Sequence, residues 1–216
     1  MTASSRTPRL LKGAIVAFRP PVPVPSVIAF QINPESLQRT VEMKAAEGQG
    51  GTETFRLSGA PKEVIKLECI FDATEDLERS DPTAMKFGLY PRLAQLEGLL
   101  APSAASTIAN AILLQLGTVE ILPQAAPFTI FVWGATRILP VKIASLSITE
   151  EAYDPNLNPI RAKVGMDLNV LTTADLQSTH PGHALYLAHQ VVKETMGLIG
   201  QVNSLGAVLG SDVRLL

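Results

Sequence analysis

Hydrophobic and polar residues alternate along several stretches of the chain, most regularly between residues 160 and 171. Every second residue there is apolar, and the residues between are polar or glycine. Because successive side chains of a β-strand point to opposite faces, this period of two predicts a long strand with one buried and one polar face. The apolar set is Ile160, Ala162, Val164, Met166, Leu168 and Val170, and the opposite set is Arg161, Lys163, Gly165, Asp167 and Asn169.

Similar patterns predict strands elsewhere in the chain. Residues 62–72 alternate clearly, and residues 37–45 predict a half-buried strand with Val41 and Met43 on its apolar face. Shorter apolar runs predict strands over 13–19 and 27–32. Proline, glycine or asparagine, which favour turns and connections, follow the segments 13–19, 27–32 and 37–45.

Two neighbouring apolar segments depart from simple alternation. Residues 128–133 are apolar on both faces, which predicts burial on both sides, in a core and against a neighbour. Residues 139–148 alternate, but the phase slips by one residue near Ala144 and Ser145. An extra residue in one strand produces such a slip, so we expect a β-bulge there.

A period near 3.6 replaces the alternation in three segments. Residues 91–100 place leucines on one stripe, with Pro91 suited to a first helical turn. Residues 103–116 are rich in alanine and leucine, and residues 182–200 place apolar side chains along another stripe. We expect a helix in each segment.

Together these elements predict a mainly β fold, an antiparallel barrel or two-sheet sandwich with a helical insertion and a C-terminal helix. We expect a flexible N-terminus at 1–11 and a β-barrel domain at 12–172 that carries the insertion at about 91–116. A C-terminal helix and tail would follow at 173–216. Prolines between 20 and 25 predict an extended connection, and the glycines between 48 and 51 predict a flexible loop.

Composition narrows the possible classes. Hydrophobic residues make up 46% of the 216 and charged residues 18%, which is typical of a globular chain. The net charge of −2 and the scattered basic residues do not predict binding to nucleic acid. The single cysteine, Cys69, is expected to be a small buried hydrophobe. We find no signal peptide or membrane-spanning stretch, so we expect cytoplasmic synthesis without direct membrane insertion.

Candidate chemistry is sparse. His180 and His183 have the spacing of metal ligands, but no nearby cysteine or carboxylate completes a site, so we expect solvated or helix-capping roles. The carboxylates at positions 72, 75, 76 and 78 are expected to form a solvated acidic loop. Phosphate-binding glycine motifs and nucleophile elbows are not found. The sequence therefore predicts no catalytic residue, no cofactor and no metal, and we expect a protein that is not an enzyme.

Two segments carry a family resemblance. The first is FQINPESLQRT at residues 30–40. The second is longer: FVWG at 131–134, LPV at 139–141, SITEEA at 147–152 and DPNLNPIRA at 154–162. The order and spacing of these motifs resemble those of contractile injection system tube-type proteins, and together they bracket residues 12–172.

The resemblance implies an Hcp-like tube fold that assembles with itself into a hexameric ring around a channel. It also implies an adaptor, or tube initiator, between the spike hub protein of the baseplate and the inner tube protein, with a baseplate wedge protein as a further partner. The ring would be part of a phage tail-like particle that can be released. Such adaptors often carry a LysM module after the barrel, whereas this chain has only a helix and a tail.

A ring with a channel requires two kinds of surface. Polar side chains on one strand face would line the channel, and a candidate set is Arg161, Lys163, Asp167 and Asn169. The alternative for this set is an ordinary solvent-exposed face. Candidate ring-interface residues are Phe131, Trp133, Asn156 and Asn158. Trp133 could instead belong to the core, and the two asparagines could act only as turn formers.

Two other functions stay open at this point. The chain could be the repeating inner tube protein or a phage tail tube protein, although the helical insertion and the C-terminal helix exceed a minimal repeating subunit. A small-molecule-binding β-barrel, or an enzyme with an unrecognised site, is the alternative outside this class.

Overall fold

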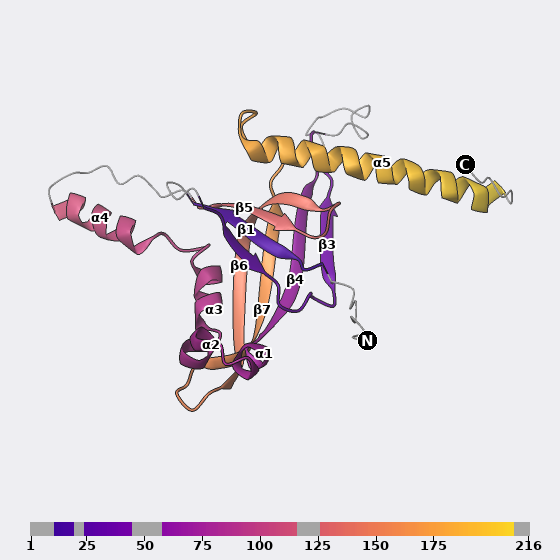
Figure 1. Ribbon diagram of the computed structural model, residues 1–216. Coiled ribbons are helices and arrows are strands. Elements are labelled where there is room, and N and C mark those ends of the chain that lie inside the picture. Colours follow the sequence, from indigo (N-terminus) through magenta and orange to yellow (C-terminus); the bar gives the residue numbers. More distant parts are fainter. Residues whose placement is uncertain (1–10, 20–23, 45–57, 116–125, 210–216) are drawn as a thin grey trace, which may run out of the picture.

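The computed structural model describes residues 11–19, 24–44, 58–115 and 126–209, and its strands form a single antiparallel sheet. The strand order is β2-β1-β5-β6-β7-β4-β3 (Figure 1). The mainly β prediction is therefore confirmed, with all seven strands in one sheet. The strands are β1 Ala14–Phe18, β2 Ser26–Ala29, β3 Leu37–Glu42, β4 Lys62–Asp72, β5 Phe128–Val132, β6 Ile138–Tyr153 and β7 Pro159–Val170.

The sheet curls so that the segment after β2 reaches back to β4. Ile32 forms an isolated antiparallel bridge with Ile70. The Gln31 amide also donates to the Asp72 carbonyl oxygen at 2.5 Å and accepts from the Asp72 N–H at 3.0 Å. The hydrogen-bonded order still has two ends, β2 and β3, so the curled sheet leaves two edge strands.

The core fills the concave side of the curled sheet. The inward residues of β7 are between 0% and 5% exposed and meet inward residues of the neighbouring strands and three buried phenylalanines, Phe30, Phe71 and Phe131. Helix α3, Tyr90–Glu97, adds Leu93 and Leu96 to this core. Burial of each large apolar side chain contributes roughly 1.5–3 kcal/mol, so this continuous core is the main source of stability.

The helices agree with the predicted segments in part. Helices α3, α4 (Ala104–Gln115) and α5 (Pro181–Leu209) are confirmed, and α5 extends beyond the predicted end at residue 200. The acidic-loop prediction is wrong, because residues 72–87 hold two short helices, α1 (Thr74–Glu78) and α2 (Pro82–Phe87). Asp81 accepts hydrogen bonds from the N–H groups of Thr83 and Ala84, both at 2.9 Å, and so caps α2. The Asp-Pro pair was the available signal, since both residues favour helix starts.

The predicted bulge is confirmed. The β6–β7 register shifts between Ile143 and Ser145, and again between Glu150 and Ala152. Cys69 is 0% exposed, as expected for a small buried hydrophobe. The expectations for residues 1–10, for 20–23 and for the glycine loop at 48–51 lie outside the described residues. The division of the chain into three parts stays a prediction.

A strand does form within residues 37–45, but the prediction that one of its faces is buried is wrong. Val41 and Met43 are 52% and 64% exposed. β3 is an edge strand that pairs only with β4, and opposite Val41 lies Glu63 instead of an apolar residue. The apolar face of β3 therefore runs past the end of the hydrophobic core.

A buried carboxylate joins β3, β4 and α5. Glu63 is 4% exposed, and its Oε1 accepts from Arg39 Nε at 2.8 Å while its Oε2 accepts from Lys193 Nζ at 3.2 Å. Burial acts to raise the pKa of Glu63, but the Arg39 hydrogen bond and the two positive charges outweigh burial and lower that pKa below its usual value. On the same helix, His189 is buried with Nδ1 3.2 Å from the Thr136 carbonyl oxygen, and burial lowers its pKa. These contacts fix the first half of α5 across the end of the sheet (Figure 1).

We expect Glu63→Gln to lower the free energy of unfolding at pH 7 by about 1–3 kcal/mol, because two charged hydrogen bonds to a buried group are lost. A carboxyl with a lowered folded-state pKa stabilises fully above its unfolded pKa of about 4.3, and that stabilisation is lost as the pH falls through the folded pKa. The variant should therefore lose less stability than the wild type on acidification below about pH 4.3.

Urea unfolding between pH 3 and pH 7 measures both effects. Glu42→Gln is the matched control, since Glu42 and Lys62 are 3.8 Å apart and both largely exposed. Its stability should change by less than about 0.5 kcal/mol. An unchanged stability of Glu63→Gln at pH 7 would contradict the role given to this carboxylate.

Gly88 at the end of α2 offers a second test. Its φ is +56°, and an added Cβ would lie 2.3 Å from the Pro159 carbonyl oxygen. We expect Gly88→Ala to destabilise the protein by at least about 1–3 kcal/mol, since strain and a backbone clash combine. Gly197→Ala is the control, because its Cβ would meet nothing within 4 Å, and a helical alanine should stabilise by about 0.5–1 kcal/mol. Thermal unfolding of the two variants should shift in opposite directions.

Candidate assembly surface

The outer face of the sheet is polar and lies opposite the core. Arg161, Lys163, Asp167 and Asn169 of β7 all point to this face, because they alternate with buried residues along the strand. The antiparallel pairing places Lys66 of β4 beside Asp167. The structure therefore brings the four candidate channel-facing residues onto one surface.

Positively charged side chains on this surface form ion pairs with negatively charged ones. Glu151 of β6 lies 2.6 Å from the Lys163 ammonium and 3.3 Å from Arg161 Nε. Asp167 lies 3.6 Å from the Lys66 ammonium. Sequence reasoning passed over Glu151, because only the second bulge of β6 inserts this residue between Glu150, opposite Ala162, and Ala152, opposite Arg161.

Lys163 keeps its charge on this face across the physiological pH range. The hydrogen bond and the negative charge of Glu151 raise the pKa of Lys163, so this lysine stays protonated. Between the charged pairs, β6 contributes Ser145 and Ser147 opposite Asp167 and Gly165. The result is a hydrophilic face of mixed sign, without an apolar patch on the described part of β7.

Two candidate ring-interface residues belong mainly to the subunit's own interior. Phe131 is 1% exposed and lies in the core, so its ring is not on the surface of the single chain. Trp133, two residues later on the same side, stacks on Phe131 with ring centroids 6.0 Å apart and is partly buried. An added Cβ at Gly13 would lie 2.7 Å from the indole, which shows how closely the backbone approaches it.

The other two candidates, Asn156 and Asn158, lie in the connection between β6 and β7, at the opposite end of β6 from Trp133. Asp154, which sequence reasoning did not single out, organises this connection. Its Oδ1 accepts from the N–H groups of Asn156 and Asn158 at 2.7 and 2.8 Å. The Asn158 amide donates to Asp154 Oδ2 at 2.8 Å and to the Lys86 carbonyl oxygen at 3.3 Å. Asn158 therefore acts as a turn former, whereas Asn156 is exposed.

These two asparagines make a matched pair for mutation. We expect Asn158→Ala to lower the free energy of unfolding by about 1 kcal/mol, because side-chain hydrogen bonds to Asp154 and Lys86 are lost. Asn156→Ala should change it by less than about 0.5 kcal/mol, since only the Asn156 backbone takes part in the turn. Chemical denaturation measures both values. Equal losses would contradict this division of roles.

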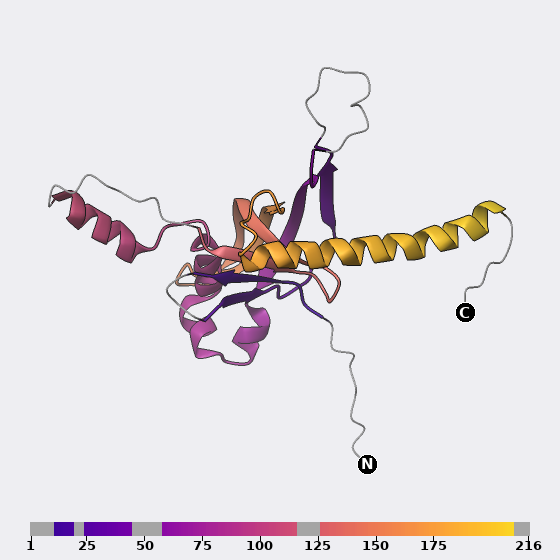
Figure 2. The same cartoon turned by 90° about the horizontal axis from the view of Figure 1, so that it is seen from above.

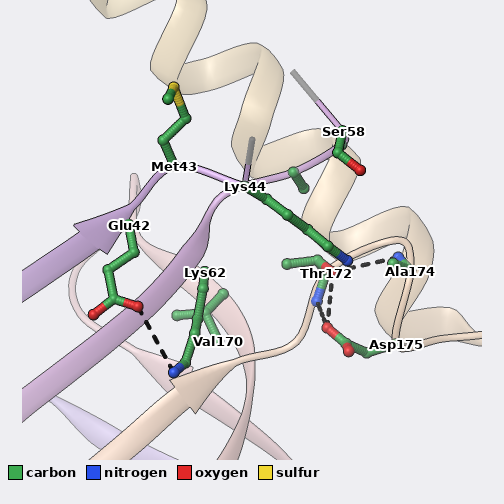
Figure 3. A pocket seen from close by; sticks show the side chains of 11 residues that line it. Glu42, Met43, Lys44, Ser58, Lys62, Val170, Thr172, Ala174 and Asp175 are labelled. Carbon is green, nitrogen blue, oxygen red and sulfur yellow. Dashed lines mark hydrogen bonds and ion pairs between the residues drawn. The ribbon is translucent and has the colours of Figure 1, made fainter. Parts of the chain in front are cut away.

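A hollow beside the sheet lies between the β3–β4 end and the connection from β7 to α5 (Figure 3). Several of its polar residues have local partners: Lys62 lies 3.8 Å from Glu42, and Asp175 accepts from the N–H and the hydroxyl of Thr172 at 2.8 and 2.7 Å. The hollow is open to solvent, and the Glu42–Lys62 pair lies apart from Thr172 and Asp175 (Figure 3). This arrangement is unlike an enclosed ligand site.

A histidine and two carboxylates that the sequence analysis considered for metal binding or catalysis have local partners. The Nδ1 atom of His180 accepts from the Gly182 N–H at 3.1 Å, next to the start of α5, which confirms a capping role. Asp76 pairs with Arg92 at 2.8 Å, and the Asp72 carboxylate accepts from the Thr74 N–H at 2.8 Å. Within the described residues, no three histidine, cysteine or carboxylate side chains gather as a metal site would require.

A membrane-spanning helix is not found in the described part of the chain, since none of its helices combines the necessary length and apolar character.

The described chain is thus a curled antiparallel sheet with a packed interior, a charge-paired outer face and two edge strands. The model of the contractile injection system tube protein family matches residues 12–179, and the chain belongs to this family. Among curated proteins, no sequence matches the chain closely enough to count as a relative.

Proposed function

We propose that the protein forms a hexameric ring that joins the spike hub and baseplate to the inner tube and templates tube assembly. The chain is a structural component of a contractile injection system by family, and the charge-paired outer face of β7 is the single observation that supports the ring most directly. A channel wall must stay hydrated and must not hold its contents. Alternating paired charges satisfy both requirements, because they attract water but present no large field of one sign.

Ring closure requires two different surfaces on each subunit that meet around the axis. The edge strands β2 and β3 offer unpaired backbone groups, and β3 adds the exposed side chains of Val41 and Met43. Such an edge favours pairing with another chain. In this proposal Asn156, at the tip of the β6–β7 connection, contacts an adjacent ring or subunit.

The assignment as an adaptor rests on α4 and α5. Helix α4 has no buried residue, and beyond Lys193 every described side chain of α5 is exposed, so both helices project from the sheet (Figure 1). A repeating tube subunit needs only the sheet and its edges, so two additional helices favour a specialised ring over a repeating subunit. The proposed partners are therefore a second copy of the chain, the spike hub protein, the inner tube protein and a baseplate wedge protein. The ring acts by stacking, without chemistry.

The repeating inner tube protein is the second candidate, and the family match favours it. That match names a tube protein and ends at residue 179, before α5. A tube contains many stacked rings, whereas an adaptor contributes one ring to each particle. Copy number therefore separates the two functions.

Affinity purification of a tagged copy from its native host tests the proposal. We expect sheathed rods in negative-stain images, with spike and tube proteins identified by mass spectrometry. The tagged chain should be present at one ring per particle. Purification from cells that do not express the sheath protein is the control. Recovery of the chain alone, under conditions where sheath protein is made, would overturn the proposal, and many rings per particle would favour the repeating tube protein.

A further inference from the structure

Helix α4 exposes an apolar surface that nothing in the described chain covers. None of its residues is buried, and Ile108, Ile112, Leu113 and Leu114 are between 43% and 60% exposed. Leaving several large apolar side chains in water on one short helix is unfavourable by roughly 1.5–3 kcal/mol each relative to burial. A contiguous surface of this kind marks an interaction site.

The second half of α5 has the same character. The first half contacts the sheet through Tyr186, His189 and Lys193. Beyond Lys193 every described side chain is exposed, and Met196, Leu198 and Ile199 are between 53% and 62% exposed. The helix thus projects past the edge of the sheet (Figures 1 and 2).

The two helices extend from opposite sides of the subunit in both views (Figures 1 and 2). The α4 and α5 of one chain therefore point away from each other. Neither surface carries charge: the sequence has no charged residue from 98 to 119 or from 195 to 211. The two surfaces match in polarity, and pairing them would bury no unpaired charge.

We propose that α4 of one copy packs against the projecting half of α5 of the next copy, head to tail. This inference rests on the proposed ring and adds the contact that links its subunits. A head-to-tail interface needs two different, complementary patches on opposite sides of the same chain, and only such an interface closes a ring of more than two copies. Small residues allow close approach of two helices: α4 contains Ala105, Ala109 and Ala111, and α5 contains Gly197.

A lipid surface fits these helices less well than a second copy. Helices that lie on membranes combine an apolar face with a face rich in lysine and arginine. The α4 segment and the projecting half of α5 contain neither residue. An uncharged helix with apolar residues around much of its surface is instead suited to packing between other helices.

Disulfide cross-linking tests the contact, because the native cysteine does not interfere. Cys69 is 0% exposed, and burial raises its pKa to about 12, so the folded chain presents no reactive thiol of its own. Ile112→Cys on α4 and Leu198→Cys on α5 are made in separate full-length chains, mixed and oxidised. We expect a disulfide-linked dimer in the mixture and little in either variant alone.

Glu78→Cys mixed with Leu198→Cys is the matched control, since Glu78 is exposed on α1, a helix that lies away from α4 (Figure 1). As a second measurement, Ile112→Glu should weaken self-association in sedimentation at least about tenfold, because a charge is placed in an apolar contact. Circular dichroism should show an unchanged fold, as Ile112 is 52% exposed and lies outside the hydrophobic core.

Each other outcome overturns the inference. Cross-links only between two copies of the same helix, or rings that Ile112→Glu leaves intact, would remove the α4–α5 contact while the proposed ring stands. A chain that stays monomeric at every accessible concentration and forms no cross-link would also remove it. The proposed function is then decided separately by the particle purification, which does not depend on self-association of the free chain.

Discussion

The structure depends on the pairing of β7 between two other long strands. β7 is hydrogen-bonded along its length to β4 on one side and to β6 on the other. Because a strand alternates its side chains, this double pairing commits one side of all three strands to the core and the other to water. A slip of one residue would bury Lys163 and Asp167 and expose Val164 and Leu168. The large cost of burying unpaired charges fixes the register, and with it both the interior and the polar surface.

Register shifts in β6 then determine which charges meet on the outer face of the sheet. The second bulge places Glu151 between two cations of β7, so that the outer face is charged without being dominated by one sign. At the other end of the sheet, the buried Glu63 holds β3 and α5 together through Arg39 and Lys193. The polar surface is therefore built on the rigid centre of the sheet, while the uncovered apolar surfaces lie on helices and an edge strand around it.

Local patterns predicted the elements well where a single property decided them. The strand at 62–72, the alternation of β7 and the bulge near Ala144 each follow from the order of apolar residues, and all are confirmed. The prediction of burial failed where the residue on the paired strand determined whether a side chain is exposed. Val41 lies on an apolar strand face but is exposed, because Glu63 stands opposite it beyond the end of the core. Phe131 was a candidate for contact between subunits, yet its position opposite Leu139 places it in the interior.

The sequence by itself determined the strand and helix segments, the polar character of one face of β7 and the resemblance to tube proteins. These properties are carried by residues close together in the chain, whose periodicity follows from backbone geometry. Only the tertiary structure decided which charges are paired, which apolar surfaces are left uncovered and on which sides of the subunit they lie. Glu151 and Lys163, or Glu63 and Lys193, meet only through strand register and helix packing, and distances of this kind leave no periodic signal in the sequence.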